Sequence, residues 1–187
     1  MSERKISSMF LEGSKVYLRP VEEGDHVFIN RGENNPVVRE QLFLAFPAGL
    51  RETVDKLSVY QSSKESIILA IIEKKSHQIV GLTAFFRLDY VSRAAVFYLA
   101  LLDPQYWSKK YGFETTQLMV RYAFDTLNLN RIQLHVCAEN AAAIKIYKKS
   151  GFQKEGVLRK AMFRNGKYID FYVMGLLRED FEQHLNN

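Results

Sequence analysis

The sequence DPQYWSKKYGFETTQLMVRYAFDT (residues 103–126) decides the fold of this chain. It reads as the end of a strand, a short basic loop and a long helix that continues to about residue 127. The N–H groups in the first turn of a helix have no intrahelical partner, and the helix dipole favours negative charge there. A strand that leads through such a loop to a helix N-terminus therefore predicts a site for an anionic, phosphate-bearing ligand.

Apolar patterns on both sides of this stretch predict the strands and helices of one mixed sheet. The expected strands cover residues 15–19, 66–72, 79–87, 94–102, 131–136, 157–162 and 168–177. Helices are expected over residues 22–31, 50–61 and 140–149, and an apolar segment covers 37–46. The strand–helix–strand unit that follows Leu102 requires a parallel or splayed pair within an otherwise antiparallel sheet. The fold class is thus a mixed α/β (α+β) layer and not a doubly wound sheet.

Length and composition indicate one ordinary globular domain. The 187 residues are 47% hydrophobic and 25% charged, and we place the domain at residues 14–184 after an N-terminal extension at 1–13. No apolar run approaches the ~20 residues of a membrane span. Cys137 is the only cysteine, which excludes a disulfide framework and favours the cytoplasm. The four histidines show no metal-ligand spacing, so we expect no metal site.

The net charge of +5 is concentrated in the half that contains the opening stretch. Residues 101–187 carry 13 Lys/Arg against 9 Asp/Glu, whereas residues 1–100 carry 13 against 12. A phosphate-bearing ligand fits this excess, although most of these lysines are typical solvated surface groups. Nucleic acid would also fit the charge, but no zinc-finger spacing, RNP-type aromatic signature or long basic run supports it. We therefore expect neither a nucleic-acid nor a membrane partner.

Three motifs in a fixed order carry a resemblance to a known family. They are Asp103-Pro-Gln-Tyr-Trp-Ser-Lys-Lys-Tyr-Gly-Phe-Glu114, Val136-Cys-Ala-Glu-Asn140 and Ile144-Lys-Ile-Tyr-Lys-Lys-Ser-Gly-Phe152. Over nearly its full length the chain resembles the GNAT superfamily of N-acetyltransferases. Within it, the chain is similar to the branch of RimJ/RimL-like ribosomal-protein N-terminal acetyltransferases and spermidine acetyltransferases. This resemblance implies a GNAT fold, with a central, mostly antiparallel seven-stranded sheet that is splayed in the middle and flanked by helices, in a monomer or homodimer.

The resemblance implies acetyl-CoA as the cofactor and assigns its pyrophosphate to the opening loop. The family pattern Gln/Arg-x-x-Gly-x-Gly/Ala falls on Trp107 to Gly112, so Lys110 stands where a glycine is usual. The loop works through backbone N–H groups, which lysine also supplies if its φ is negative. The residues expected to bind the cofactor here are Ser108, Lys109, Lys110, Tyr111, Gly112 and Phe113.

Asn140 and Tyr147 form a second group of expected site residues. They are seven positions apart, so they lie on one helix face about 10 Å apart along the axis, with Ile144 between them. The resemblance implies that Asn140 contacts the pantetheine arm and that Tyr147 is the general acid for the leaving thiolate. Asn140 also suits a helix N-cap, and Tyr147 a half-buried core position. A backbone N–H of Leu101 or Leu102, freed by a bulge, would polarise the acetyl carbonyl.

The acceptor amine is less clearly indicated. A lysine-like amine with a pKa of about 10.4 costs about 4.6 kcal/mol to deprotonate at pH 7, whereas an α-amine costs only about 1–1.4 kcal/mol. Spermidine acetyltransferases that resemble this chain carry a glutamate in the strand before the loop, and Ala95 occupies that place here. Glu139, His135 and Asp170 are other candidate bases, none of them preferred.

These observations lead to a prediction of direct, acetyl-CoA-dependent acetylation of a primary amine. The preferred acceptor is a protein or peptide N-terminal α-amine. The alternatives are a small amine, such as a polyamine or an antibiotic, and a non-catalytic CoA-binding or sensing module.

Overall fold

The computed structural model describes residues 9–185, with side chains as far as residue 183. Residues 1–8, which are most of the predicted extension, and the side chain of His184 lie outside this description. The strands are β1 (Leu11–Glu12), β2 (Val16–Pro20), β3 (Ser66–Glu73), β4 (Ile79–Asp89), β5 (Ala94–Leu101), β6 (Arg131–Cys137), β7 (Gln153–Arg164) and β8 (Lys167–Leu177). The α-helices are α1 (His26–Asn34), α2 (Pro36–Leu42), α3 (Leu50–Ser62), α4 (Tyr111–Arg121), α5 (Ala141–Lys149) and α6 (Arg178–Leu185). Short 3₁₀ helices cover Glu23–Asp25 (η1) and Pro104–Tyr106 (η2).

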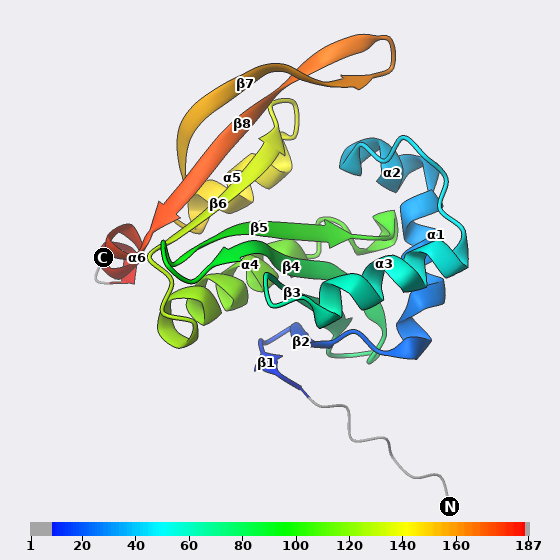
Figure 1. Ribbon diagram of the computed structural model, residues 1–187, viewed down its shortest axis with the longest axis horizontal. Helices are drawn as coiled ribbons and strands as arrows, with labels where there is room; N and C mark the ends of the chain where they lie inside the picture. The colour runs from blue at the N-terminus through cyan, green and yellow to red at the C-terminus, as the bar shows by residue number, and fades with distance from the viewer. Residues whose placement is uncertain (1–8, 186–187) are drawn as a thin grey trace, which may run out of the picture.

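The strands form one sheet that is splayed in its middle (Figure 1). Their order is β1-β2-β3-β4-β5-β6-β8-β7, and every neighbouring pair is antiparallel except β5 and β6. These two parallel strands pair only where Ala94–Val96 of β5 meets Arg131–Gln133 of β6. Beyond Val96 the two strands are no longer paired and diverge toward their C-terminal ends. The predicted mixed sheet with a central splay is therefore confirmed.

Side-chain alternation along the central strands creates one apolar core on each face of the sheet. On one face, Ile68, Ala70 and Ile72 of β3 belong to a core that includes residues of α1, α2 and α3. On the other face, Leu69 and Ile71 join a core that includes residues of α4, α5 and α6. This arrangement explains why the central strands read as continuous apolar runs, since both of their faces are covered.

The structure contains two elements that the sequence patterns did not indicate. The two-residue strand β1 pairs with β2 and brings the sheet to eight strands, one more than predicted. It lies inside the predicted extension 1–13, so the domain boundary stays a prediction. Helix α6 follows β8 directly and packs Phe181 against Phe124, with ring centroids 5.1 Å apart. None of the helices in the described part of the chain is long and apolar enough to span a membrane.

Three predicted elements differ in their ends. The helix predicted at residues 22–31 begins as the 3₁₀ helix η1 and continues as α1 to Asn34. Helix α4 ends at Arg121 and continues as one turn of π-helix over Tyr122–Thr126, within the range predicted as one helix. Strand β7 begins four residues before the predicted start, and two register shifts interrupt its pairing with β8. These shifts break the strict alternation on which the prediction of strand ends depends.

Two contacts fix helix α1 relative to the sheet. Arg19 of β2 donates two hydrogen bonds to the carboxylate of Asp25 in η1, at 2.7 and 2.8 Å, and both residues are buried. Gly32 of α1 lies against Leu102, because a Cβ on this glycine would be 2.5 Å from Leu102 Cβ. Helix α1 thus approaches the backbone at the end of β5, where the splay opens.

Candidate active site

The loop between β5 and α4 reverses the chain through two residues in the left-handed region. Ser108 has a φ of 61° and Lys110 a φ of 71°. The condition under which a lysine would serve as readily as a glycine, a negative φ at position 110, is therefore not met. The reversal between strand and helix requires the left-handed conformation at the position where the family pattern has glycine, and for an L-residue this costs about 1–2 kcal/mol.

The first turn of α4 nevertheless retains donors for an anion. Lys110 is its N-cap residue and makes no side-chain capping hydrogen bond. The first intrahelical hydrogen bond of α4 runs from Glu114 N–H to Lys110 C=O. The N–H groups of Tyr111, Gly112 and Phe113 precede it and therefore have no acceptor within the helix. Successive N–H groups next to left-handed residues form concave anion sites. The loop therefore fits the diphosphate of acetyl-CoA.

Gly112 leaves space beside these N–H groups. A Cβ at this position would be 3.5 Å from Ile146 Cδ1 and 3.7 Å from Leu99 Cδ2, which are ordinary contact distances. Packing within the protein does not require a glycine here, so the need for a small residue would have to come from a bound ligand.

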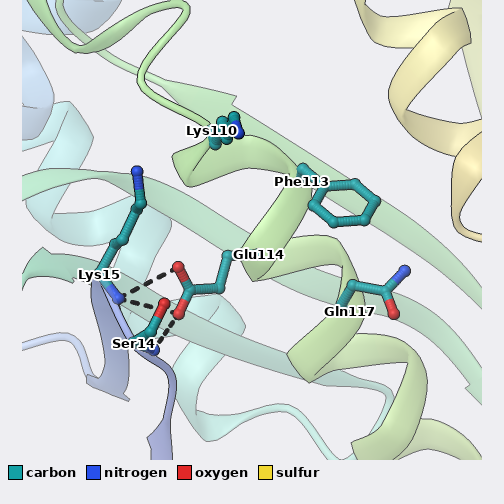
Figure 2. Close-up of a pocket in the computed structure, with 6 residues that line it drawn as sticks. All are labelled: Ser14, Lys15, Lys110, Phe113, Glu114 and Gln117. Carbon is teal, nitrogen blue, oxygen red and sulfur yellow. Dashed lines mark hydrogen bonds between the residues drawn. The ribbon is translucent and has the colours of Figure 1, made fainter.

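The lysines of the loop point in different directions. Lys109 Nζ lies 5.3 Å from the centre of the Tyr106 ring. Lys110 is exposed and lines a cavity of about 250 Å³ between α4 and the β1–β2 turn, shown in Figure 2. The other lining residues are Ser14, Lys15, Phe113, Glu114 and Gln117. In this view Glu114 points to the backbone of the β1–β2 turn, where its carboxylate accepts from the N–H groups of Ser14 and Lys15. Glu114 therefore anchors that turn in addition to its place in the first helical turn.

At the end of β5, only one of the two expected carbonyl-polarising groups is available. The N–H of Leu102 donates to Val80 C=O at 3.0 Å, so Leu102 is excluded from this role. Polar groups along an antiparallel strand alternate in direction, and those of Leu101 therefore point to the side from which β6 has diverged. Trp107 Nε1 reaches Leu101 C=O from that side at 3.2 Å. The expected bulge is also absent at this point, since the register shift between β4 and β5 lies at their other end, between Phe86 and Asp89.

Helix α5 carries the second group of expected site residues on the same face of the sheet as α4. Asn140 caps the helix, and its Oδ1 accepts from Ala143 N–H at 3.0 Å. This contact shows the capping role; within the described residues the Nδ2 group has no partner and remains a donor for a ligand. Ile144 and Tyr147 are half-buried against the core beneath them.

Tyr147 combines core packing with an uncommitted hydroxyl. Its ring packs edge-on against Phe97 and Phe152, at centroid distances of 6.3 and 5.8 Å. Burial raises the pKa of Tyr147 to about 12. No hydrogen bond to its hydroxyl is found in the part of the chain that the structure describes. A neutral phenol in this position can donate a proton to a leaving thiolate, whose pKa is about 8.5.

Of the three bases considered from sequence, two are engaged elsewhere and the third is exposed on the sheet surface. Glu139 pairs with Lys167 and Arg164 at 2.9 and 2.7 Å, and the hydrogen bond from Lys167 is the first cause that lowers its pKa. Asp170 accepts from Lys160 N–H at 2.7 Å, and His135 lies exposed on the sheet surface. Ala95 is buried in the sheet opposite Ile132.

A different carboxylate, that of Glu33, lies near the C-terminal end of β5. It follows Gly32, which contacts Leu102, and it pairs with Lys56 of α3 at 2.7 Å. Burial, and after it the charge of Glu33, raises the pKa of Tyr98 on β5. No local pattern pointed to Glu33, because its place depends on the close approach of α1 to the end of β5.

The tip of the β7–β8 hairpin borders the same side. Asn165 Nδ2 donates to the carboxylate of Glu40 on α2 at 2.7 Å. Phe43, just after α2, packs edge-on against Phe171 of β8 with ring centroids 4.9 Å apart. Figure 1 shows how the hairpin extends from the sheet toward α2. The splay is thus bordered by α1 and α2 on one side and by the hairpin on the other.

A splayed parallel strand pair that leads through an N–H-lined loop to a helix defines a GNAT-type acyltransferase with a CoA site. A family model described as acetyltransferase (GNAT) domain matches residues 15–153. The chain belongs to this family, and it is accordingly an acetyltransferase that uses acetyl-CoA.

Several relatives that cover most of this chain are named as spermidine acetyltransferases. A spermidine N(1)-acetyltransferase of Escherichia coli K12 is 33% identical over 170 residues, which cover 89% of this chain and 88% of that protein. The crystal structure of spermidine N-acetyltransferase from Vibrio cholerae in complex with CoA and spermine matches with a TM-score of 0.83 and 27% identity, covering 91% of this chain and 99% of that one. A dodecameric structure of the Vibrio cholerae enzyme matches with a TM-score of 0.77 and 27% identity, covering 90% and 97%. These matches support the spermidine part of the resemblance and do not specifically support the RimJ/RimL-like part.

Proposed function

We propose that this acetyltransferase acts on a small amine of the polyamine class. The carrying observation is the match over about nine-tenths of the chain to enzymes named for spermidine. It favours the small-amine alternative over the protein N-terminal α-amine that the sequence-based prediction preferred. The absence of an acidic side chain in β5 (Ala94–Leu101) is the feature that still favours the less basic α-amine.

Glu33 supports the polyamine proposal from the structure. Its carboxylate is only 12% exposed and already holds one ammonium group, that of Lys56. A cationic acceptor that enters beside α1 would meet this carboxylate close to the end of β5. We infer that Glu33 orients the ammonium chain of the acceptor, in competition with Lys56. The pair could then exchange one ammonium partner for another without leaving a buried carboxylate unpaired, which would be costly.

The chain's own groups would hold acetyl-CoA on the α4–α5 side of the sheet, and the acceptor amine would approach from the side of α1. Acetyl-CoA, when bound, supplies an activated acetyl thioester. With the cofactor bound, the N–H of Leu101 would donate to the acetyl oxygen, and the N–H groups of Tyr111, Gly112 and Phe113 would hold the diphosphate. Tyr147 would give its proton to the departing sulfur, and the proton that the amine loses would pass to water. Cys137 is buried, only 5% exposed, which favours direct attack by the amine over transfer through a cysteine.

A substrate panel tests this proposal. The purified protein and acetyl-CoA would be mixed with spermidine, spermine, putrescine or Ser- and Ala-initiated peptides, and thiol release would be followed. We expect turnover with the polyamines at a kcat/KM well above that of the peptides. Turnover confined to peptides would restore the α-amine assignment. Tight CoA binding without turnover on any amine would indicate a non-catalytic module.

The role of Glu33 has a matched control on the neighbouring helix. Glu33→Gln should raise KM for spermidine about tenfold, the scale of one lost charge-assisted contact, while KM for acetyl-CoA is unchanged. Glu52→Gln removes the same charge from an exposed position of α3 and should change neither constant. Equal values of KM for spermidine in the two variants would remove Glu33 from the acceptor site.

Two further properties remain proposals. The dodecameric relative favours an assembly larger than the expected monomer or homodimer, and light scattering on the purified protein would decide between them. The single cysteine supports a cytoplasmic location.

A further inference from the structure

A hydrogen-bond network outside the expected site ties the first residue of α4 to the end of β3. Glu73, the last residue of β3, accepts from the hydroxyl of Tyr111. Ser76 Oγ donates to the other oxygen of the same carboxylate at 2.5 Å. Tyr111 is only 7% exposed and lies 38 positions away along the chain. This contact joins the end of the loop to β3, which is not one of the two elements that the loop connects.

The contact joins a phenol donor to a carboxylate acceptor, which makes it a charge-assisted hydrogen bond. Bonds from Ser76 and then from Tyr111 lower the pKa of Glu73, and the bond to Glu73 raises the pKa of Tyr111 to about 12. The Tyr106 ring lies 6.4 Å from that of Tyr111 and carries the ammonium of Lys109 at 5.3 Å. The side chains of Tyr106, Lys109 and Tyr111 therefore group around this carboxylate.

The loop needs such external support because its own sequence does not favour its conformation. Ser108 and Lys110 are both left-handed without being glycine, and no side chain caps α4. The direction of the N–H groups of Tyr111 and Gly112 depends on the backbone at Lys110. A fixed Tyr111 side chain restrains that backbone from the helical side.

We propose that Glu73 is a positioning residue for the diphosphate of acetyl-CoA, acting through the hydroxyl of Tyr111. By holding Tyr111, it keeps the first turn of α4 and the left-handed Lys110 in the orientation that directs their N–H groups at the ligand. This inference rests on the proposed use of the loop as the diphosphate site. It is not a simple charge effect, because a carboxylate near a diphosphate opposes binding, so its removal would otherwise strengthen CoA binding.

Four variants separate positioning from charge. Glu73→Ala removes both the charge and the acceptor, Glu73→Gln removes the charge and keeps an acceptor, and Tyr111→Phe removes only the donor. The double variant Glu73→Ala/Tyr111→Phe tests whether both side chains act in one interaction. Glu65→Ala, exposed before the other end of β3, and Tyr168→Phe, exposed on β8, are matched controls. Thermal unfolding would verify that each variant is folded.

The readouts are the calorimetric Kd of CoA and the steady-state constants with acetyl-CoA and with acetylpantetheine, which lacks the diphosphate. Glu73→Ala and Tyr111→Phe should each raise the Kd of CoA and the KM of acetyl-CoA about tenfold, as for the loss of one hydrogen bond to a charged group. We expect kcat to stay within about twofold, and kcat/KM for acetylpantetheine to be unchanged, because no diphosphate is held. Glu73→Gln should lie nearer the unmodified protein, and the double variant should be no worse than either single one.

The outcomes distinguish this inference from the assignment beneath it. If the unmodified protein prefers acetyl-CoA to acetylpantetheine but Glu73→Ala binds CoA equally well or more tightly, the positioning role is refuted and the loop assignment survives. An equal loss with acetylpantetheine would likewise refute it, since the effect would not be specific to the diphosphate. If the unmodified protein shows no preference for acetyl-CoA, both the diphosphate site and the role of Glu73 are refuted.

Discussion

Replacing Gly112 by alanine should separate ligand binding from stability, because the protein has room for a methyl group that the ligand would not tolerate. The added Cβ would meet Ile146 Cδ1 at 3.5 Å and Leu99 Cδ2 at 3.7 Å, so no neighbour has to move. Alanine also favours a helix over glycine by up to about 1 kcal/mol in an interior position, and by less in a first turn. We therefore expect Gly112→Ala to leave the free energy of unfolding unchanged or to raise it by about 0.5 kcal/mol.

The same methyl group should weaken CoA binding. The N–H of Gly112 belongs to the uncapped first turn, and a ligand that accepts from it must approach this part of the backbone closely. The displacement of one phosphate contact should raise the Kd of CoA about 10- to 100-fold, equivalent to about 1.4–2.8 kcal/mol.

Two measurements on the same sample check this prediction, namely denaturant unfolding and calorimetric titration with CoA. Gly24→Ala is a suitable control, because a Cβ there meets nothing within 4 Å and the residue lies in η1, away from α4. A lower unfolding free energy with an unchanged Kd would refute the reasoning, since Gly112 would then serve packing within the protein and not the ligand.

Other substitutions test other parts of the structure. Lys110→Gly should raise the unfolding free energy by about 0–1 kcal/mol, because relief of the left-handed conformation exceeds the entropy cost of glycine; a clear loss in denaturant unfolding would contradict this. Asp25→Ala should lower the unfolding free energy by about 3–5 kcal/mol, since it leaves Arg19 buried without its carboxylate; a loss below about 1 kcal/mol would show that the pair is dispensable. Tyr147→Phe should lower kcat about 10- to 100-fold with an unchanged Kd for CoA, and an unchanged kcat would remove Tyr147 from the mechanism. Because burial raises its pKa to about 12, Tyr147 stays protonated as the pH rises, so kcat of the unmodified protein should not decline as the pH is raised to about 10. A decline between about pH 8 and 10 that Tyr147→Phe abolishes would contradict the raised pKa.

The sequence predicted those features that depend on local patterns. The strands around the splay and the helices α3 and α5 follow from apolar periodicity and lie within one or two residues of their predicted ends. The N-cap at Asn140 follows from its side chain, and its hydrogen bond to Ala143 N–H shows that the local preference was satisfied. The two-residue strand β1 could not be read in this way, because two residues have no period.

The missed parts of the site depend on contacts between distant segments. Glu73 reaches Tyr111 only because β3 and the start of α4 meet in the fold. Glu33 lies beside β5 only because Gly32 lets α1 approach Leu102. The conformation of Lys110 belongs to the same class, since lysine has no local preference for a positive φ and the reversal of the chain imposes it.

The lysine at position 110 has a backbone cost that its own charge does not offset. Its left-handed backbone costs about 1–2 kcal/mol, and an exposed charge near a phosphate contributes about 0–1 kcal/mol. The charge alone therefore does not offset the backbone. Trp107, which bonds to Leu101 C=O, and Tyr111, which bonds to Glu73, bracket the left-handed residues and restrain the loop from both ends. A hydrogen bond to a charged group contributes about 1.5–3 kcal/mol, enough to maintain a loop in which lysine replaces the usual glycine. It follows that Lys110→Gly should make the loop less dependent on the Glu73–Tyr111 contact. CoA binding should then be less sensitive to Tyr111→Phe in the Lys110→Gly background than in the unmodified protein.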